Sequence, residues 1–335
     1  MTLDFQRLTE FLHQQGVTAQ IRTARQLTGG ASRDTWAIDA DFEGRPVGLV
    51  LRRDLGGQIV EHALDRAAEY LVMQRAAAGN IPVPRPGWLC LDPSVAGAPF
   101  ILMERLEGES IGRRIVRDPA LAEARKVLPA QMAMLLARIH RLDYQDLNFL
   151  PQPAPGQSPA QQALERAERQ LRALGEPHPA LELALRWLTP RVPQCPQPVL
   201  VHGDFRLGNI MVGPHGLIGI FDWEFAHIGD PAEDLAWPCV RSWRFGQDHL
   251  RFAGLAQPDE FLAAYRYSGG ENVDPDRLLF WEILGNLTWA VGCIQQAHRH
   301  LSGQAPSLEF ASLGRRTAEM ELELLDLIAR VEKSS

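Results

Sequence analysis

The chain has 335 residues, of which 45% are hydrophobic and 22% charged, and its 34 basic and 41 acidic side chains give a net charge of −7. This composition is typical of a soluble globular protein, with enough chain for two domains or lobes. The acidic balance argues against nonspecific nucleic-acid binding, although a local basic pocket for phosphate remains compatible with it.

The sequence also bears on the compartment. Its four cysteines, at positions 90, 195, 239 and 293, lie far apart without a CxxC pair, so neither a zinc site nor a disulfide framework is expected. The start, MTLDFQRLTEFLHQQG, is too charged for a secretory signal. No apolar run approaches the roughly 18 residues that cross a bilayer. We therefore expect a cytoplasmic protein without a membrane partner.

The first third of the chain predicts a small β-rich unit. An amphipathic helix at residues 3–15 precedes strand-like runs over residues 20–53, which contain FEGR as a hairpin candidate. Residues 60–78 are rich in alanine and predict a helix, which GNIPVPRPG ends. The apolar run at residues 98–108, APFILMERLEG, predicts a further strand.

Beyond Gly108 the sequence becomes mainly helical. A helical run over residues 118–143 contains Pro129, which we expect to kink or split it. Further helices are predicted near residues 160–174, 178–191 and 256–333. We therefore predict an α+β protein of two lobes, with a β-rich N-terminal lobe (residues 1–108) and a helical C-terminal lobe (residues 109–335).

Polar residues follow two apolar strand-like runs within residues 199–231, VLVHGDFRLGNIMVGPHGLIGIFDWEFAHIGDP. The run VLV leads to His202 and Asp204, and LIGIF leads to Asp222, with Asn209 between them. If the strand-like runs around the PHG turn pair as a hairpin, Asn209 and Asp222 could share a hard cation such as Mg²⁺. Asp204 would lie beside them, free to accept a proton. Alternatively, these residues cap turns or bond backbone, as single loop aspartates usually do.

A base beside two metal-holding oxygens is the minimal apparatus for phosphoryl transfer. The spacing D-x-x-x-x-N, followed by a strand and an aspartate, resembles the catalytic loop and DFG segment of protein kinases. With HGD for HRD and DWE for DFG, the chain more closely resembles the aminoglycoside phosphotransferase and choline kinase-like family. HGDFRLGNIMV…IFDWEFAHIGDPAEDLAW is similar to the branch fused to acyl-CoA dehydrogenases in some animals.

This resemblance implies a protein-kinase-like fold and an Mg²⁺-dependent kinase that takes ATP or GTP as phosphate donor. It makes Asp204 the catalytic base, with Asn209 and Asp222 completing the catalytic set as the ligands of Mg²⁺. It also implies that His202 packs beneath the loop and that Asp234 bonds the loop's backbone amides.

The family pattern places a nucleotide lid upstream. LTGGASRDTWAI (residues 27–38) lies between strand-like runs, where Gly29, Gly30 and Ser32 would approach phosphate. A plain hairpin turn would show the same composition.

Three further nucleotide contacts are implied by position. Arg52 stands where kinases place a lysine, and a guanidinium keeps that charge but is not geometrically interchangeable with an ammonium. Glu69 on the following helix would pair with Arg52. Backbone groups at Met103, Glu104 and Arg105 would bond the purine base.

The acceptor pocket is expected in the helical lobe, with five candidate residues: Arg206, Trp223, Glu224, Arg241 and Glu282. Their mixed charge fits an anionic or neutral hydroxylated small molecule at least as well as a polycationic aminoglycoside. Tryptophans in such helices are, however, more often core. A hydroxyacyl-CoA or an amino alcohol as acceptor is suggested by the likeness alone.

Two other functions stay open. A kinase-fold binding protein with little turnover would account for the missing lysine. A metal-dependent hydrolase using His202 and Asp204 would leave the glycine-rich segment, Arg52 and Glu69 unexplained.

Overall fold

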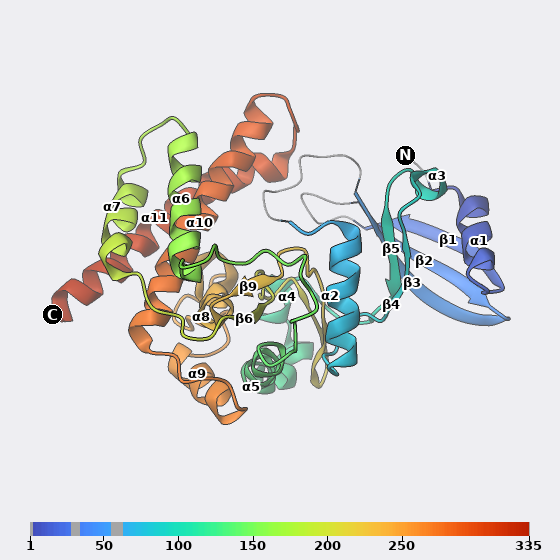
Figure 1. Cartoon of the computed structure of the whole chain (residues 1–335), viewed down its shortest axis with the longest axis horizontal. Coiled ribbons are helices and arrows are strands. Elements are labelled where there is room, and N and C mark those ends of the chain that lie inside the picture. Colours follow the sequence, from blue (N-terminus) through green and yellow to red (C-terminus); the bar gives the residue numbers. More distant parts are fainter. Residues whose placement is uncertain (1–2, 28–33, 55–62, 335) are drawn as a thin grey trace.

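The structure, a computed structural model, describes residues 3–27, 34–54 and 63–334. Its N-terminal part is a five-stranded antiparallel sheet of order β1-β2-β3-β5-β4 (Figure 1). The strands are β1 (Ala19–Gln26), β2 (Asp34–Phe42), β3 (Arg45–Arg53), β4 (Pro86–Cys90) and β5 (Phe100–Glu104). Strand β3, which carries Arg52, is therefore central and pairs on both sides.

The FEGR hairpin predicted from the sequence joins β2 to β3. Phe42 pairs with Arg45, and between them Glu43 and Gly44 have φ angles of 52° and 80°. Two-residue turns with positive φ at both positions match the twist of the flanking strands, and glycine adopts that conformation without steric cost. The hairpin prediction is confirmed.

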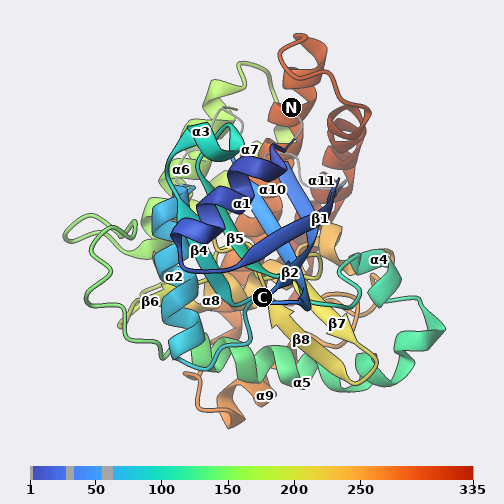
Figure 2. The ribbon, with the colours of Figure 1, turned by 90° about the vertical axis from the view of Figure 1, so that its right-hand side faces the viewer.

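Helix α1 (Phe5–Gln14) lies across the sheet in Figure 2. Asp4 caps its first turn by accepting hydrogen bonds from the amides of Gln6 and Arg7. Leu8, Phe11 and Leu12 are buried on one side of the helix, at the spacing of an amphipathic helix. They pack into a core with strand residues such as Phe100, whose ring meets that of Phe11 edge-on at 5.5 Å.

Helix α2 (Arg66–Ala78) lies between the sheet and the helical part of the molecule (Figure 1). It begins after Asp65, whose carboxylate accepts a hydrogen bond from the Ala68 amide. The predicted start at residue 60 falls outside the described residues. One short helix, α3 (Pro93–Ala96), precedes β5.

The rest of the described chain is mainly helical. Its α-helices are α4 (Gly112–Ile115), α5 (Ala122–Ile139), α6 (Pro159–Ala173), α7 (Pro179–Leu188), α8 (Pro231–Ala236), α9 (Pro258–Tyr267), α10 (Pro275–Leu301) and α11 (Leu308–Ser334). Short 3₁₀ turns are η1 (Pro119–Leu121), η2 (Thr189–Arg191), η3 (Trp237–Cys239) and η4 (Arg241–Arg244). The helices predicted near 160–174 and 178–191 are α6 and α7, and the predicted helical tail forms α9, α10 and α11.

Pro129 lies inside α5 but does not split it. A proline in a helix removes one backbone hydrogen bond and crowds the carbonyl four residues earlier. Here Leu128, Met132 and Leu136 are fully buried in the main core. We infer that the packing of this face offsets the cost of the proline, so the expected division of the helix does not occur.

Two small sheets bring the polar motif together. Strand β6 (Val199–Val201) pairs with β9 (His227–Gly229), and β7 (Ile210–Gly213) pairs with β8 (Gly216–Ile220) as the predicted hairpin. In Figure 2 this yellow hairpin lies beside α5. Glu109 exchanges backbone hydrogen bonds of 2.9 Å with Val212, so the chain leaving the N-terminal sheet is tied to β7.

Helix α10 is the central helix of the helical part. It packs against α6, α7, α8 and α11. Contrary to the sequence expectation, it is long and apolar enough to cross a membrane by length and composition, with a window of mean hydropathy 1.2. However, 72% of that window is buried inside the fold, as expected of a core helix.

The β-rich N-terminal part and the helical C-terminal part confirm the predicted α+β, two-lobed fold of the protein-kinase type. The chain leaves the sheet at Glu104, and Glu109 already pairs with β7. A boundary between residues 108 and 109 stays a prediction.

Candidate active site

The catalytic loop predicted from HGD follows β6, and its backbone is held by Asp234 of α8. The Asp234 carboxylate accepts hydrogen bonds from the amides of His202 at 2.7 Å and Gly203 at 2.9 Å. Gly203 has a φ of 79°, and a Cβ there would collide with the carbonyl of Phe225, so glycine is required at this turn. The predicted contact between Asp234 and the loop is confirmed.

His202 packs beneath the loop, as the family pattern implied. It is fully buried, and its ring lies 4.6 Å from that of Trp223. Its Nε2 is 3.2 Å from the carbonyl oxygen of Phe221, which links the catalytic loop to the DWE segment. These contacts give His202 a structural role.

Asp204 lies at the centre of the site and is 9% exposed. Its Oδ1 accepts hydrogen bonds from Nε of Arg206 at 2.9 Å and from Nε1 of Trp237 at 2.7 Å. Its Oδ2 accepts a hydrogen bond from Nδ2 of Asn209 at 2.6 Å. The carboxylate is therefore fixed, as a proton acceptor for an incoming hydroxyl must be.

Asn209 and Asp222 are brought together by the hairpin. The Phe221 amide donates a 3.0 Å hydrogen bond to the Asn209 carbonyl, and Asp222 follows with a φ of 71°. The side-chain hydrogen bonds of Asn209 to described residues are donated by Nδ2 to Asp204. Its Oδ1 is thus an available oxygen ligand, on a backbone that is hydrogen-bonded to the residue before Asp222.

This donor set fits Mg²⁺. Magnesium prefers oxygen ligands and is usually held by one or two protein groups together with substrate phosphates, not by a complete protein cage. Consistently, no group of three or more His, Cys, Asp or Glu side chains that could hold a metal occurs within residues 3–27, 34–54 and 63–334.

Arg52 joins the sheet to this site. Its guanidinium donates to Oε1 of Glu69 at 3.1 Å and to Oδ1 of Asp222 at 2.6 Å. Burial would lower the pKa of Arg52, but the charges of Asp222 and Glu69 outweigh it and hold that pKa above its ordinary value. Burial would likewise raise the pKa of Asp222, and the Arg52 charge instead holds it below its ordinary value. The predicted pairing of Arg52 with Glu69 is confirmed.

Sequence reasoning missed Arg66. It is buried at the start of α2, and its side chain lies 2.5 Å from Glu69 and 3.1 Å from Asp54. Glu69 is therefore shared between two arginines. An arginine three residues before a buried glutamate on one helix face was the available signal.

The predicted hinge residues lie at the end of β5 and directly after it. Met103 lies within β5, where it pairs with Val50 of β3. The Glu104 amide donates to the Arg85 carbonyl and the Arg105 amide to the Gly48 carbonyl, both at 3.0 Å. These two amides are therefore already hydrogen-bonded within the protein, and the contact of this segment with a purine stays a prediction. The lid residues Gly29, Gly30 and Ser32 lie outside the described residues.

The five predicted acceptor residues have different surroundings: one contacts Asp204, two are buried, and two belong to an ionic cluster. Arg206 lies at Asp204, with its guanidinium 4.3 Å from the ring centre of Trp243. Trp223 is fully buried against His202, so it cannot stack on an acceptor and that prediction is wrong. Glu224 is also buried, and its carbonyl accepts a 2.7 Å hydrogen bond from the Leu64 amide.

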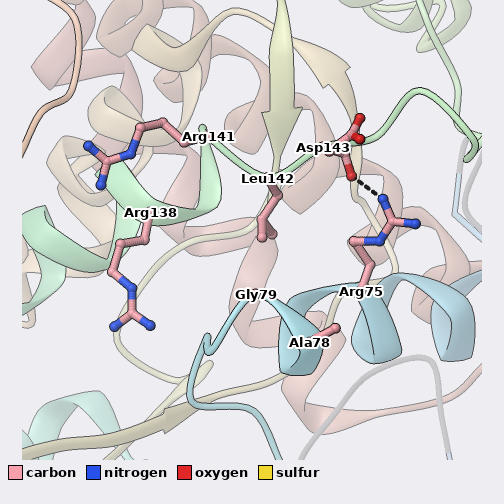
Figure 3. A pocket seen from close by; sticks show the side chains of 7 residues that line it. All are labelled: Arg75, Ala78, Gly79, Arg138, Arg141, Leu142 and Asp143. Carbon is pink, nitrogen blue, oxygen red and sulfur yellow. Dashed lines mark hydrogen bonds between the residues drawn. The ribbon is translucent and has the colours of Figure 1, made fainter.

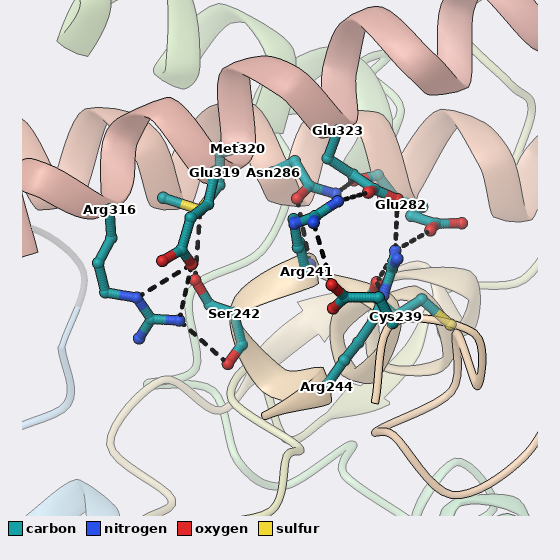
Figure 4. Close-up of polar contacts among 11 residues, drawn as sticks. Cys239, Arg241, Ser242, Arg244, Glu282, Asn286, Arg316, Glu319, Met320 and Glu323 are labelled. Carbon is teal, nitrogen blue, oxygen red and sulfur yellow. Dashed lines mark hydrogen bonds and ion pairs between the residues drawn. The ribbon is translucent and has the colours of Figure 1, made fainter. Parts of the chain in front are cut away.

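Arg241 and Glu282 belong to a buried ionic cluster that ties η4 to α10 and α11 (Figure 4). Arg244 contacts Glu282 at 3.1 Å and Glu323 at 2.6 Å, and Arg241 contacts Glu323 at 3.0 Å. Glu282 also pairs with Arg251. Its carboxylate is fully buried and already paired, so the predicted acceptor contact of Glu282 is wrong. Arg241 likewise forms an ion pair inside the protein, with Glu323.

A separate cavity of about 480 Å³ lies between the end of α2 and the end of α5 (Figure 3). It is lined by Arg75, Ala78, Gly79, Arg138, Arg141, Leu142 and Asp143, and by none of the site residues described above. Arg75 donates to the Asp143 carbonyl and, at 2.5 Å, to the Asp146 carboxylate. These contacts anchor α2 to the helical part, and we assign no catalytic role to this cavity.

Comparison with known proteins agrees with this geometry. Residues 23–281 match the family model described as the phosphotransferase enzyme family. The chain is 29% identical over 292 residues to acyl-CoA dehydrogenase family member 10 of Mus musculus, covering 81% of this chain and 26% of that protein. The chain thus spans about a quarter of the length of that curated relative.

Solved structures show the same fold. A candidate aminoglycoside phosphotransferase from Ralstonia eutropha superposes with a TM-score of 0.77 at 23% identity, covering 98% of this chain and 99% of that chain. A spectinomycin phosphotransferase in complex with ADP and spectinomycin has a TM-score of 0.66 at 15% identity, with 97% and 99% covered. Since the family model spans most of the chain, this protein belongs to the phosphotransferase enzyme family.

Proposed function

We propose that this phosphotransferase is a small-molecule kinase that moves the γ-phosphoryl group of a Mg²⁺-bound nucleotide to a hydroxyl group of a small organic acceptor. The observation that carries the proposal is the convergence of Asp204, Asn209 and Asp222 on two linked loops, with Arg52 reaching them from the sheet. A base, two oxygen ligands and a phosphate-binding cation are the parts that phosphoryl transfer needs.

Each residue has a distinct task. Asp204 accepts the proton of the acceptor hydroxyl, and Asn209 and Asp222 would hold Mg²⁺, which neutralises charge on the phosphates when bound. Arg52, oriented by Glu69, would contact the nucleotide phosphates. The acceptor oxygen forms a bond to the γ-phosphorus while the bond to the β-phosphate oxygen breaks, and the nucleoside diphosphate leaves.

The donor is proposed to be ATP or GTP. The spectinomycin phosphotransferase with this fold was solved with ADP, which supports an adenine nucleotide without excluding guanine. The acceptor is a hydroxylated small molecule, and a screen should include a hydroxyacyl-CoA, an amino alcohol and an aminoglycoside.

A kinase-fold binding protein with little turnover is the second candidate, favoured by the arginine at the lysine position and by its ion pair with Asp222. Thermal melting of the wild type, Asp222→Ala and Asp204→Ala with Mg·ATP, Mg·GTP or neither, together with a phosphate-transfer screen of acceptors, distinguishes the two. Ligand at about 100 times its dissociation constant stabilises the native state by roughly 2.7 kcal/mol.

A kinase shows a Mg²⁺-dependent shift that Asp222→Ala loses and Asp204→Ala keeps, and phosphate transfer that both variants lose. A shift without transfer in an acceptor screen supports the binding protein. No shift with either nucleotide contradicts the kinase and puts a protein that binds another ligand in first place.

A further inference from the structure

One of the donors that fix Asp204 lies outside the catalytic loop. Trp237 of η3 and Arg206 both donate to Oδ1, at 2.7 and 2.9 Å, and Asn209 donates to Oδ2 at 2.6 Å. A carboxylate offers about four acceptor sites, two on each oxygen. The described side chains therefore occupy both sites of Oδ1 and one site of Oδ2.

We propose that Trp237 is a positioning residue for the base. Its indole N–H, together with Arg206, saturates Oδ1 and leaves Oδ2 as the oxygen that accepts the acceptor's proton. In that step the O–H bond of the acceptor breaks, its proton passes to Oδ2, and its oxygen bonds to the γ-phosphorus as the nucleoside diphosphate leaves. The proposal rests on the function proposed above.

The position of Trp237 in the chain supports this role. It lies three residues after Asp234, and residues at this spacing share a helix face. Asp234 bonds the backbone amides of His202 and Gly203, whereas Trp237 bonds the side chain of Asp204. A single turn of chain therefore fixes both the backbone of the catalytic loop and its base.

Packing, and not the hydrogen bond alone, orients the indole. Gly285 lies inside α10, where a glycine costs about 1 kcal/mol relative to alanine. A Cβ at Gly285 would lie 3.4 Å from Cε3 of Trp237 and 2.9 Å from Cγ2 of Val240. The Trp243 ring lies 5.9 Å from the Trp237 ring. The glycine thus lets Val240, which follows η3, approach α10 closely, with the Trp237 ring in contact range of the same helix position.

The chemistry of indole suits this task. Its N–H donates a hydrogen bond but cannot accept one, so it cannot compete with Asp204 for the proton. The group is also neutral, so it orients the carboxylate without adding a second positive charge to that of Arg206.

The contact can be tested without knowing the acceptor, by NMR of the full chain labelled with ¹⁵N-tryptophan. The chain has eight tryptophans. Trp237→Phe assigns the Trp237 indole resonance, and Trp187→Phe assigns that of Trp187, whose Nε1 donates to Glu332 at 3.1 Å far along the chain. In Asp204→Asn we expect the Trp237 resonance to move and the Trp187 resonance to stay. An unmoved Trp237 resonance would overturn the proposal.

Turnover tests the positioning role. We measure nucleoside diphosphate release from Mg·ATP or Mg·GTP, with water or with an acceptor found by screening. Trp237→Phe should lower kcat about 10-fold, the value of one good hydrogen bond, with the nucleotide melting shift unchanged. Trp237→His, which restores a donor, should recover part of the loss, and Trp187→Phe should match the wild type.

The two proposals fail differently. Wild-type turnover in Trp237→Phe, alongside loss in Asp204→Ala, overturns the positioning role alone. Undiminished turnover in Asp204→Ala overturns the base and, with it, the role of Trp237.

Discussion

Arg52 and Asp222 lie 170 positions apart in the chain and form an ion pair of 2.6 Å. The pair joins the central strand of the sheet to the predicted metal ligand in the helical part. In this arrangement the Arg52 guanidinium contacts the same carboxylate that Mg²⁺ would need. If nucleotide and Mg²⁺ bind here as proposed, the partners of Arg52 change, with phosphate oxygens as the natural replacement.

Replacing Arg52 should weaken nucleotide binding. Arg52→Ala removes the phosphate contact and leaves Glu69 and Asp222 with less positive charge, so we expect the dissociation constant of Mg·ATP or Mg·GTP to rise about 10-fold or more. Arg52→Lys keeps the charge but loses the planar fork and should lie between. Titration calorimetry measures both. Arg172→Ala, at an exposed ion pair of α6, is the control, and unaltered affinity in Arg52→Ala would remove Arg52 from the phosphate site.

Asp234 should make the stability of the loop after β6 depend on pH in the acidic range. Burial would raise its pKa, but the hydrogen bond and charge of His140, with His202, hold the pKa below its ordinary value of 3.8. Because the folded pKa is depressed, this contribution is fully present above pH 3.8 and is lost as the pH falls through the lower folded value.

Asp234→Asn removes that charge and should lower the free energy of unfolding at pH 7 by about 2–4 kcal/mol. Between about pH 5 and pH 2, the free energy of unfolding of this variant should depend less on pH than that of the wild type. Urea denaturation at several pH values measures this. Asp326→Asn, at an exposed position of α11, should behave like the wild type. Equal acid sensitivity in wild type and Asp234→Asn would contradict the assignment.

Glu282 should matter for stability and not for ligand binding. Burial raises the pKa of its carboxyl, and the charges of Arg251 and Arg244 counter that shift only in part. Glu282→Ala removes the carboxylate that pairs with Arg251 and one of the two that pair with Arg244, and it should lower the free energy of unfolding by about 3–5 kcal/mol. The melting shift with Mg·nucleotide should persist in the folded variant. Glu332→Ala, at an exposed ion pair, is the control, and loss of the nucleotide shift alone would return Glu282 to the binding site.

The sequence predicted the β7–β8 hairpin and the loop contacts of Asp234 because their signals are local. HGD and the second aspartate each follow a short apolar strand, and an asparagine lies five residues after Asp204. The β7–β8 hairpin joins these segments, as the period of the strand residues predicted. The contact of Asp234 with the loop was implied by the family resemblance. Asp234 lies within the quoted motif, at a fixed distance in the chain from HGD. Arg52 and Glu69 were placed by their order along the chain, and the structure brings them to 3.1 Å.

The acceptor side was predicted poorly because its signals are not local. Trp223 is next to Asp222 in the chain, yet its ring turns into the core against His202. Glu282 and Arg241 carry charges that suggest a binding pocket, but Glu282 is paired with Arg244, and Arg241 is paired with Glu323 of α11. A residue type does not reveal whether its side chain faces solvent or a distant helix.

By itself, the sequence determined the class of fold and which residues we propose as the base and the two oxygen ligands, since strand period, turn residues and motif spacing act over a few positions. Only the tertiary structure decided that Arg52 reaches Asp222, that Trp237 bonds Asp204, and that Glu282 is buried in an ionic cluster. These contacts join residues 33 to 170 positions apart, or depend on burial. Their geometry follows from how the sheet, α8 and α10 pack, which no local pattern encodes.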